Sequence, residues 1–162
     1  MFHFDKTDAL FYNYLRMNYT IRRAEENDFS SIYKLNQEFA HFIKTPEKFY
    51  ISLEQMIAEQ HFFKMLVIEN ESLEIIGFAT TYIAWYSWIG KSLYLDDIYI
   101  QEKYRGRGLG SKLMDEVFAM AKKENCRKIR WQVSKWNTNA IEFYKKKGAV
   151  IDNVEMNCDV IL

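Results

Sequence analysis

The stretch Tyr104-Arg105-Gly106-Arg107-Gly108-Leu109-Gly110-Ser111 lies between an apolar run, Leu93 to Ile100, and an amphipathic segment, Leu109 to Lys123. The apolar run has the residue types of a strand, and the following segment repeats apolar residues at helical spacing. Glycines let a backbone approach a ligand closely, and successive N–H groups at a helix start form a nest for an anion. Arg105 and Arg107 add charges that can pair with phosphate. The stretch therefore predicts a phosphate-binding loop.

Two common nucleotide motifs do not fit this spacing. Both the Walker A motif and the Rossmann fingerprint, when started at Gly106, require a glycine where the chain has Ser111. The pattern R-x-x-G-x-G matches in full, with Arg105, Gly108 and Gly110. A turn that merely starts a helix is the simpler alternative, but such a turn requires neither two arginines nor three alternating glycines.

Outward from this loop, apolar periodicity and turn residues predict the other elements. The expected strands are Tyr19–Arg22, Phe62–Glu69, Ile75–Trp85, Ser92–Gln101, Ile129–Val133 and Met156–Leu162. The expected helices start near Asn27 or Asp28, cover Leu53–Glu59 and Leu109–Lys123, and run from Asn137 to Lys147 before Gly148. Helices embedded in a mostly antiparallel sheet indicate an α+β (α/β) domain with a mixed sheet. We expect one domain over residues 17–162, with residues 1–16 as an N-terminal extension or an extra docked helix.

Composition excludes several classes of protein. The 162 residues are 49% hydrophobic and 17% aromatic, which argues against disorder, and 22 basic residues balance 22 acidic ones, which gives no case for a nucleic-acid partner. Two distant cysteines and three scattered histidines do not form a metal site. No apolar run reaches membrane-spanning length, and the first residues lack the features of a signal peptide. We therefore expect no metal, no membrane partner and a cytoplasmic location.

The phosphate loop, together with a second motif, resembles the GNAT superfamily of N-acetyltransferases. R-x-x-G-x-G after a strand is that family's acetyl-CoA pyrophosphate motif. The downstream stretch from Asn137 through Phe143-Tyr144 to Gly148-Ala149 is similar to the family's N-x-x-A-x-x-F-Y-x-x-x-G-F/A pattern. The run Trp88-Ile89-Gly90-Lys91 to Ile100 further resembles the diamine (spermidine/spermine) or thialysine N-acetyltransferase branch.

The resemblance implies a GNAT fold, with a mixed, mostly antiparallel sheet of about six to seven strands and about four flanking helices. It also implies that acetyl-CoA is the co-substrate and that two strands splay apart to admit its pantetheine arm. The implied acetyl-CoA-binding residues are Ile98, Tyr99, Ile100, Arg105, Gly106, Arg107, Gly108, Leu109, Gly110, Ser111, Asn137, Ala140, Tyr144 and Lys146. Asn137 is also placed to cap the last helix.

Acetyl transfer to an amine requires two proton movements. An alkyl amine has a pKa of about 10.4 and arrives protonated, so it needs a base, and the departing thiolate needs an acid. The resemblance places Tyr144 as the acid. The alternative is that Tyr144 is a buried tyrosine with only a structural role. Asp96 is the candidate base, directly or through a water, and Asp97 would attract the cationic amine. Strand alternation predicts that these two carboxylates point to opposite faces and cannot act as one pair.

The acceptor is less well specified than the donor. The resemblance assigns Trp88 to the amine site, where an aromatic face can hold an ammonium by cation–π attraction. The branch's Tyr-Glu pair at the end of the first long helix is replaced here by Phe42-Ile43, which argues against a long polyamine. We expect a small-amine acetyltransferase that forms a homodimer. A non-catalytic acyl-CoA-binding module and a protein N-acetyltransferase are the alternatives.

Overall fold

The computed structural model describes residues 18–154, 158 and 160. The chain forms two compact units, one ending at Trp131 and the other beginning at Gln132. The prediction of one domain over residues 17–162 stays a prediction, and residues 1–16 lie outside the described residues.

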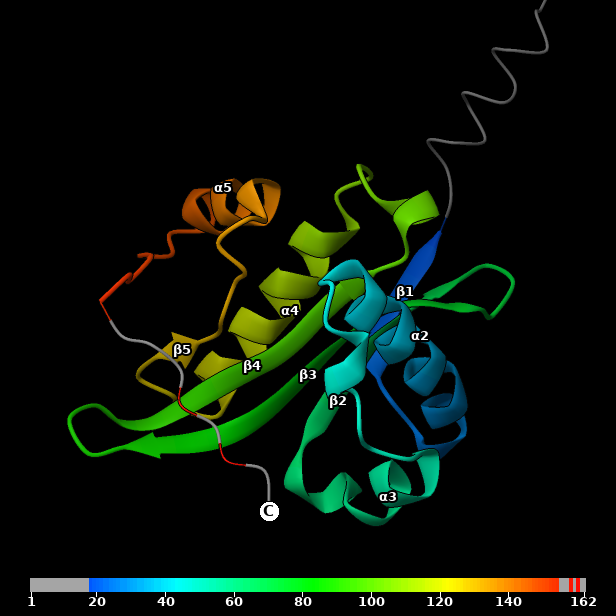
Figure 1. Cartoon of the computed structure of the whole chain (residues 1–162), viewed down its shortest axis with the longest axis horizontal. Helices are drawn as coiled ribbons and strands as arrows, with labels where there is room; N and C mark the ends of the chain where they lie inside the picture. The colour runs from blue at the N-terminus through cyan, green and yellow to red at the C-terminus, as the bar shows by residue number, and fades with distance from the viewer. Residues whose placement is uncertain (1–17, 155–157, 159, 161–162) are drawn as a thin grey trace, which may run out of the picture. The chain divides into compact units, whose positions relative to one another are not determined.

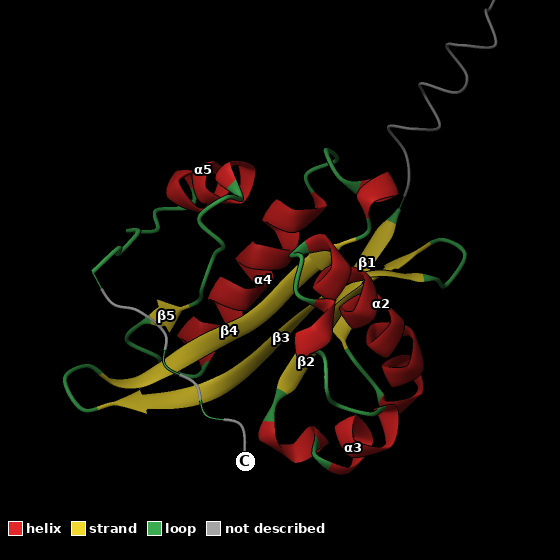
Figure 2. Ribbon diagram, viewed as in Figure 1, coloured by secondary structure: helices red, strands yellow, loops and turns green. Residues whose placement is uncertain are grey.

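A five-stranded sheet forms the centre of the first unit (Figures 1 and 2). Its strands lie in chain order, antiparallel from β1 to β4, and β5 pairs parallel with β4. Their bounds are β1 Tyr19–Arg23, β2 Lys64–Asn70, β3 Ile75–Tyr86, β4 Gly90–Ile100 and β5 Ile129–Arg130.

The predicted mixed sheet is confirmed, but the predicted count of strands was too high for the described part of the chain. The strand expected over Ile129–Val133 is only two residues long, because the chain leaves β4 after Arg130. The strand expected over Met156–Leu162 falls mainly outside the described residues.

Four α-helices are described, and all four were expected. Their bounds are α2 Phe29–Phe42, α3 Leu53–Ala58, α4 Leu109–Lys123 and α5 Thr138–Lys146, and α5 belongs to the second unit. Short 3-10 turns, η1 Glu26–Asp28, η2 Pro46–Lys48, η3 Gln60–Phe62 and η4 Glu102–Tyr104, link these elements. The Ser52 hydroxyl accepts a hydrogen bond from the Gln55 N–H, which caps α3 as its sequence predicts.

Helices cover both faces of the sheet in the first unit. Phe78 of β3 and Tyr99 of β4 belong to one buried cluster with Ile32 of α2. Thr81 points to the opposite face, where its hydroxyl lies 3.6 Å from the sulfur of Met120 in α4. The sheet is therefore the middle layer between α2 and α4, and the glycine loop leads from its fourth strand into α4.

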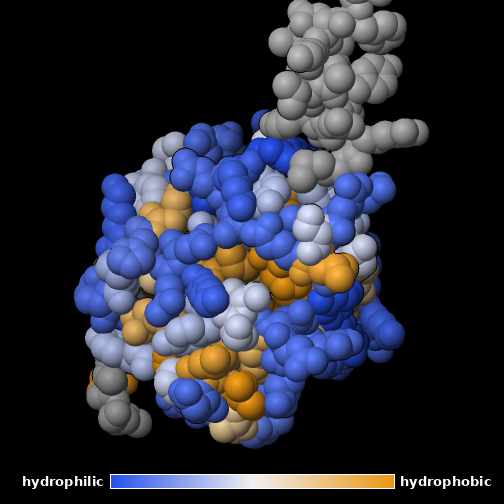
Figure 3. Space-filling view, turned by 90° about the vertical axis from the view of Figure 1, so that its right-hand side faces the viewer, coloured by the Kyte–Doolittle hydropathy of each residue, from blue (hydrophilic) through white to orange (hydrophobic). Residues whose placement is uncertain are grey.

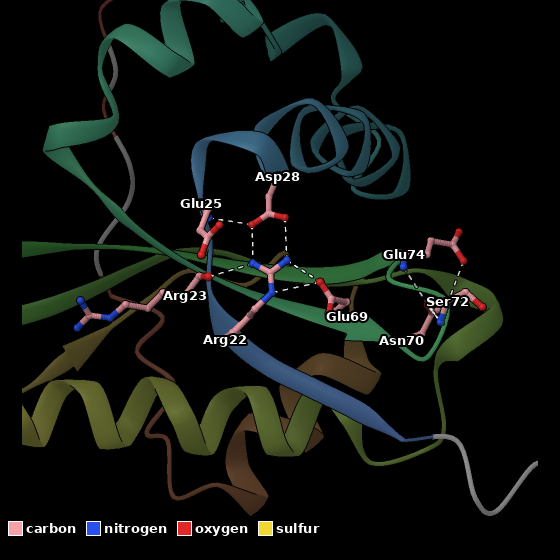
Figure 4. A network of polar contacts seen from close by, with 8 residues as sticks. All are labelled: Arg22, Arg23, Glu25, Asp28, Glu69, Asn70, Ser72 and Glu74. Carbon is pink, nitrogen blue, oxygen red and sulfur yellow. Dashed lines mark hydrogen bonds and ion pairs between the residues drawn. The ribbon is translucent and has the colours of Figure 1, made fainter.

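A network around Arg22 ties β1 and β2 to the start of α2 (Figure 4). The Arg22 guanidinium donates to both carboxylate oxygens of Asp28, at 2.6 and 2.9 Å, and to Glu69 at 2.6 Å. Asp28 also accepts from the Glu25 N–H at 2.8 Å, within a capping box. The hydrogen bond from Arg22 holds the pKa of Asp28 below its usual range. The network fixes the first helix to the edge of the sheet.

Replacing Arg22 by alanine should lower the free energy of unfolding by about 2 kcal/mol at pH 7, because two half-buried carboxylates lose their charged donor. The depressed pKa of Asp28 means that its contribution is present above about pH 4 and is lost as the pH falls through the folded-state value. The difference between Arg22→Ala and wild type, measured by urea unfolding, should therefore shrink at pH 3. Arg23→Ala, one residue on and exposed, is the control, and an equal loss there would contradict the prediction.

The surface is not uniformly polar. Figure 3 shows hydrophobic residues gathered in bands between hydrophilic ones on the side that carries α2 and α3. Phe42, Tyr50 and Phe62, from α2 and the segments around α3, are 37%, 71% and 68% exposed. Within the described residues, none of the helices combines the length and the apolar character that a bilayer crossing requires.

Candidate active site

The glycine loop joins β4 and η4 to the first turn of α4. Gly106 and Gly108 have φ of 75° and 76°, in the left-handed region that favours glycine, and Gly108 is the N-cap of α4. A Cβ added at Gly106, Gly108 or Gly110 would meet no atom within 4 Å. The loop therefore has open space above its backbone, at a helix end whose first N–H groups have no intrahelical acceptor. This geometry fits the pyrophosphate of a nucleotide.

Both loop arginines are bonded within the chain. Arg105 Nε donates to the Ile100 carbonyl at 2.9 Å, and its guanidinium lies 4.2 Å from the centre of the Phe42 ring. Arg107 Nη2 donates to the Lys103 carbonyl at 3.0 Å. The role of these two side chains as phosphate ligands stays a prediction, and the geometric case for the cradle rests on the glycine backbone.

The edge of β4 beside the loop lacks a strand partner over much of its length. β5 pairs with β4 only at Leu93 and Tyr94, so within the described residues the edge from residue 95 onward is open on that side. The Gln101 N–H bonds to β3, and alternation then turns the backbone of Ile98 and Ile100 toward the open edge. The resemblance implied that a pantetheine arm would pair along this part of β4, and that role stays a prediction.

Tyr99 is oriented differently from its two neighbours. Alternation turns its backbone toward β3, its ring is 7% exposed in the core, and its hydroxyl bonds to Glu38 at 3.4 Å. Its assignment to the acetyl-CoA site therefore has no support from the position of its backbone or its ring.

A β-bulge places both carboxylates of the acid pair on one face of the sheet. Thr80 pairs with Asp97 and Tyr82 pairs with Tyr94, with one extra β4 residue between these pairs. Thr80 and Tyr82 share a face, so their partners Asp97 and Tyr94 share it too. Asp96, two residues after Tyr94, lies on that face as well. The expectation that alternation separates the two carboxylates was wrong, because the bulge interrupts the alternation between them.

The acid pair is electrostatically unusual. Burial raises the pKa of Asp97 to about 7, and the charge of Asp96 adds to the rise. Burial also raises the pKa of Asp96, although that side chain keeps an exposed surface. Within the described part of the chain, neither carboxylate has a hydrogen-bond or ion-pair partner. Two unpaired acids with raised pKa values are suited to binding a cation or accepting a proton.

Two tyrosines that sequence reasoning missed lie beside the acids. The rings of Tyr82 and Tyr94 stack with centroids 5.0 Å apart. Burial and the charge of Asp96 raise the pKa of Tyr82 to about 12, so its hydroxyl stays neutral. Only the cross-strand register could have identified Tyr82 and Tyr94 as site residues, because nothing in the local sequence distinguishes them from the other nine tyrosines.

Trp88 lies apart from the acid pair within this chain. It is 97% exposed in the turn between β3 and β4, and Asp96 lies six residue steps along β4 from Gly90. At about 3.3 Å per residue this is roughly 20 Å. The structure therefore does not bring Trp88 to Asp96 and Asp97 of the same chain.

The second unit carries the downstream motif. The Asn137 side-chain oxygen accepts from the Ala140 N–H at 3.2 Å, so Asn137 caps α5. Tyr144 is 7% exposed, with its ring 5.3 Å from that of Phe143, and Lys146 is exposed. The roles of Asn137, Ala140, Tyr144 and Lys146 toward acetyl-CoA stay predictions.

Two named relatives are similar to this chain in sequence. Thialysine N-epsilon-acetyltransferase of Bos taurus is 34% identical over 140 residues, which cover 80% of this chain and 82% of the relative. Spermidine/spermine N(1)-acetyltransferase-like protein 1 of Homo sapiens is 27% identical over 142 residues, which cover 82% of this chain and 20% of that protein.

Solved structures share the fold, and a family model matches most of the chain. An aminoglycoside acetyltransferase from an uncultured soil metagenomic sample superposes with a TM-score of 0.74 at 19% identity, covering 89% of this chain and 96% of the other. A Pyrococcus furiosus protein proposed to be an acetyl transferase gives a TM-score of 0.69 at 27% identity, covering 88% of this chain and 100% of the other. Residues 29–149 match the model of the acetyltransferase (GNAT) family. The chain therefore belongs to the GNAT family and is an acyltransferase.

Proposed function

We propose that this chain transfers an acetyl group from acetyl-CoA to a primary amine of a small cationic acceptor, such as a diamine, a polyamine, thialysine or a similar amine. The observation that carries the proposal is the acid pair, Asp96 and Asp97, which shares a sheet face with two tyrosines and lies on the strand whose edge is open. Relatives named for thialysine and for spermidine or spermine support the acceptor class.

Acetyl-CoA supplies the acetyl group as an activated thioester, and the residues present fit its binding. The loop at Gly106 and Gly108 would hold the pyrophosphate through backbone N–H groups at the start of α4. The open edge at Ile98 would pair with the amides of the pantetheine arm. Ile100 would join that pairing once Arg105 releases its carbonyl, which Arg105 Nε bonds in this structure.

The acid pair would prepare the acceptor. A carboxylate of Asp96 or Asp97 attracts the ammonium and accepts one of its protons, directly or through a water. The neutral nitrogen then forms a C–N bond with the acetyl carbon as the C–S bond breaks. Tyr144 would donate a proton to the departing sulfur, since a phenol of ordinary pKa near 10 can protonate a developing thiolate. The acetylated nitrogen then loses its second proton, which returns to the Tyr144 oxygen through water, so the products are an N-acetyl amine, free CoA thiol and one proton held by the carboxylate.

Thiol release from acetyl-CoA tests the proposal directly. We expect turnover with at least one member of a panel of diamines, polyamines, thialysine, free amino acids and a peptide. Tyr144→Phe should lower kcat by about 100-fold or more while acetyl-CoA affinity changes little, since only the proton donor is lost. Tyr50→Phe, at a tyrosine that is 71% exposed, is the control. Full activity of Tyr144→Phe would remove this residue from the acid role, and turnover of the peptide alone would favour a protein acetyltransferase.

A homodimer remains part of the proposal. The hairpin of β3 and β4 exposes Ile83, Trp85, Trp88 and Ile89, which are 42%, 72%, 97% and 38% accessible. Large apolar side chains of this kind are enriched in interfaces between subunits, and their clustering on one hairpin supports self-association.

A further inference from the structure

The hairpin of β3 and β4 extends past the end of β2 (Figures 1 and 2). The pairing of β2 with β3 stops at Lys64 and Thr81, so within the described residues β3 has no strand partner on that side after Thr81. On its other side, β3 stays paired with β4 as far as Tyr86. The last residues of β3 therefore form an open edge of the sheet, which we call the β3 edge.

Backbone alternation shows which groups the β3 edge presents. The Leu93 N–H donates to the segment that leads into β5, so the backbone of Leu93 faces β5 and the backbones of its two neighbours face β3. Their partners in β3 face β4 in turn, which leaves Ile83 and Trp85 turned outward. Each of these two residues presents an N–H and a carbonyl that no strand in the described part of the chain pairs.

The β3 edge lacks the usual protection against a further strand. Natural sheet edges commonly carry a charge or a proline, or lie under a covering segment, which prevents such pairing. Residues 82–90 include no Asp, Glu, Lys, Arg or Pro, although 27% of the chain is charged. The two outward residues instead carry large apolar side chains, and Ile83 and Trp85 are 42% and 72% exposed. The edge is therefore suited to pairing with an apolar strand.

A cavity of about 280 Å³ lies beside the β3 edge, where β2 stops. It is smaller than most sites for drug-sized ligands, and its size suits one large side chain. The ion pair of Lys64 with Glu124, at 2.8 Å, forms part of its wall. The rest of the wall is mostly apolar and includes Phe62, Phe63, Thr81, Ile83, Leu93 and Met120. A strand added at the edge would therefore find a cavity for one of its side chains.

A second copy of β3 satisfies the edge and the cavity together. In an antiparallel pair with a two-fold axis at Ala84, Ile83 lies opposite Trp85 of the partner subunit, and Trp85 lies opposite the partner's Ile83. These are the residues whose backbones face outward, so each pair exchanges two hydrogen bonds. Directly opposite residues share a face, so the partner's Trp85 lies beside Ile83, which lines the cavity. The strand that bears the open edge thus also bears the side chain that fits the cavity.

We propose that a second copy of this chain pairs with the β3 edge, with the two-fold axis at Ala84 and with Trp85 of each subunit in the cavity of the other. This inference rests on the homodimer of the proposed function and supplies its interface. The central sheet then continues from one subunit into the next. The open edge of β4, which lies on the other side of the hairpin, stays available for acetyl-CoA.

Sedimentation equilibrium measures the strength of the interface. Trp85→Lys should raise the dissociation constant of the wild-type dimer by about 100-fold or more, because it removes a central aromatic anchor and places a charge at the edge. Leu73→Lys is the matched control, since it places the same charge at an apolar residue that is 76% exposed in the turn between β2 and β3. It should leave the dissociation constant unchanged.

Disulfide cross-linking tests the register. In a background of Cys126→Ser and Cys158→Ser, Ala84→Cys should give a covalent dimer on mild oxidation. The axis makes the two copies of residue 84 a non-hydrogen-bonded pair with Cα atoms about 4.5 Å apart, which a disulfide can span. Tyr86→Cys in the same background is the control. Its two copies are offset by four residues along the strands, about 13 Å, and should not cross-link.

The outcomes separate this interface from the rest of the proposed function. A wild-type dimer that persists in Trp85→Lys, or that cross-links through Tyr86→Cys and not Ala84→Cys, overturns the interface alone. A wild-type monomer overturns the homodimer with it, and a lower melting temperature of that monomer in Trp85→Lys would assign the edge to a segment of the same chain. Absence of thiol release with any amine overturns the proposed acetyl transfer and not the interface.

Discussion

Asp96→Asn will lower kcat/KM for the amine acceptor by about 100-fold or more, within the range that general acid–base groups contribute. Asp96 is unpaired in the described part of the chain and lies on the same face as Asp97, so its carboxylate faces the acceptor in the proposed mechanism. The amide keeps the size of the side chain but can neither carry the charge nor take the proton. Initial rates of thiol release at saturating acetyl-CoA measure the effect.

The pH profile of the same variant tests whether the two carboxylates act together. In the wild type, kcat/KM should rise with pH through a limb near pH 7, because burial and the charge of Asp96 raise the pKa of Asp97 to about 7. Without the charge of Asp96 the pKa of Asp97 falls, so the limb of the residual activity should move to lower pH. Glu116→Gln, an exposed acid on α4, should leave the limb in place.

The thermal stability of Asp96→Asn shows whether a loss of activity reflects the missing carboxylate or a loss of folded protein. An acid whose pKa is raised in the folded state makes its most favourable contribution to stability below about pH 4, and that contribution is lost as the pH rises toward the folded-state value. Asp96→Asn removes one such acid, so its melting temperature should match or exceed that of the wild type at pH 8. A large loss of stability there, or wild-type activity, would contradict the role of Asp96.

Sequence periodicity predicted the fold well because local signals carry it. The amphipathic pattern of α4, the glycines before it and the serine cap of α3 each act within a few residues, and each appears where expected. The bulge in β4 has no such signal. It depends on the register against β3, whose partner residues lie more than ten positions away along the chain, and it decides that Asp96 and Asp97 share a face.

The site residues show the same division between local and long-range information. Gly106 and Gly108 were identifiable because the glycine-rich stretch before α4 is a local motif, and the left-handed φ at both positions favours glycine. The position of the Arg105 side chain was not, because its partners Phe42 and Ile100 come from two other elements. Arg130 carries no motif at all, and only the parallel register of β5 places it beside Tyr94.

Gly108→Val will weaken acetyl-CoA binding by about 100-fold or more. The backbone φ of 76° at this N-cap suits glycine, and a β-branched side chain there costs on the order of 2 kcal/mol in strain. Its methyl groups would also fill the open space above the loop, where the phosphates must approach the N–H groups at the start of α4. Isothermal titration calorimetry with acetyl-CoA measures the loss.

A control substitution at a second glycine distinguishes the effect of backbone strain from the loss of the phosphate-binding loop. Gly90, at the start of β4, has a φ of 88°, and a Cβ there meets nothing closer than the Arg127 side chain at 4.0 Å. Gly90→Val and Gly108→Val should therefore lose similar free energies of unfolding, because both force valine into the left-handed region. Only the change at Gly108 should weaken acetyl-CoA binding by about 100-fold or more. Equal affinities in the two variants would show that the loop before α4 does not hold the pyrophosphate, and the open β4 edge would then have to bind acetyl-CoA without it.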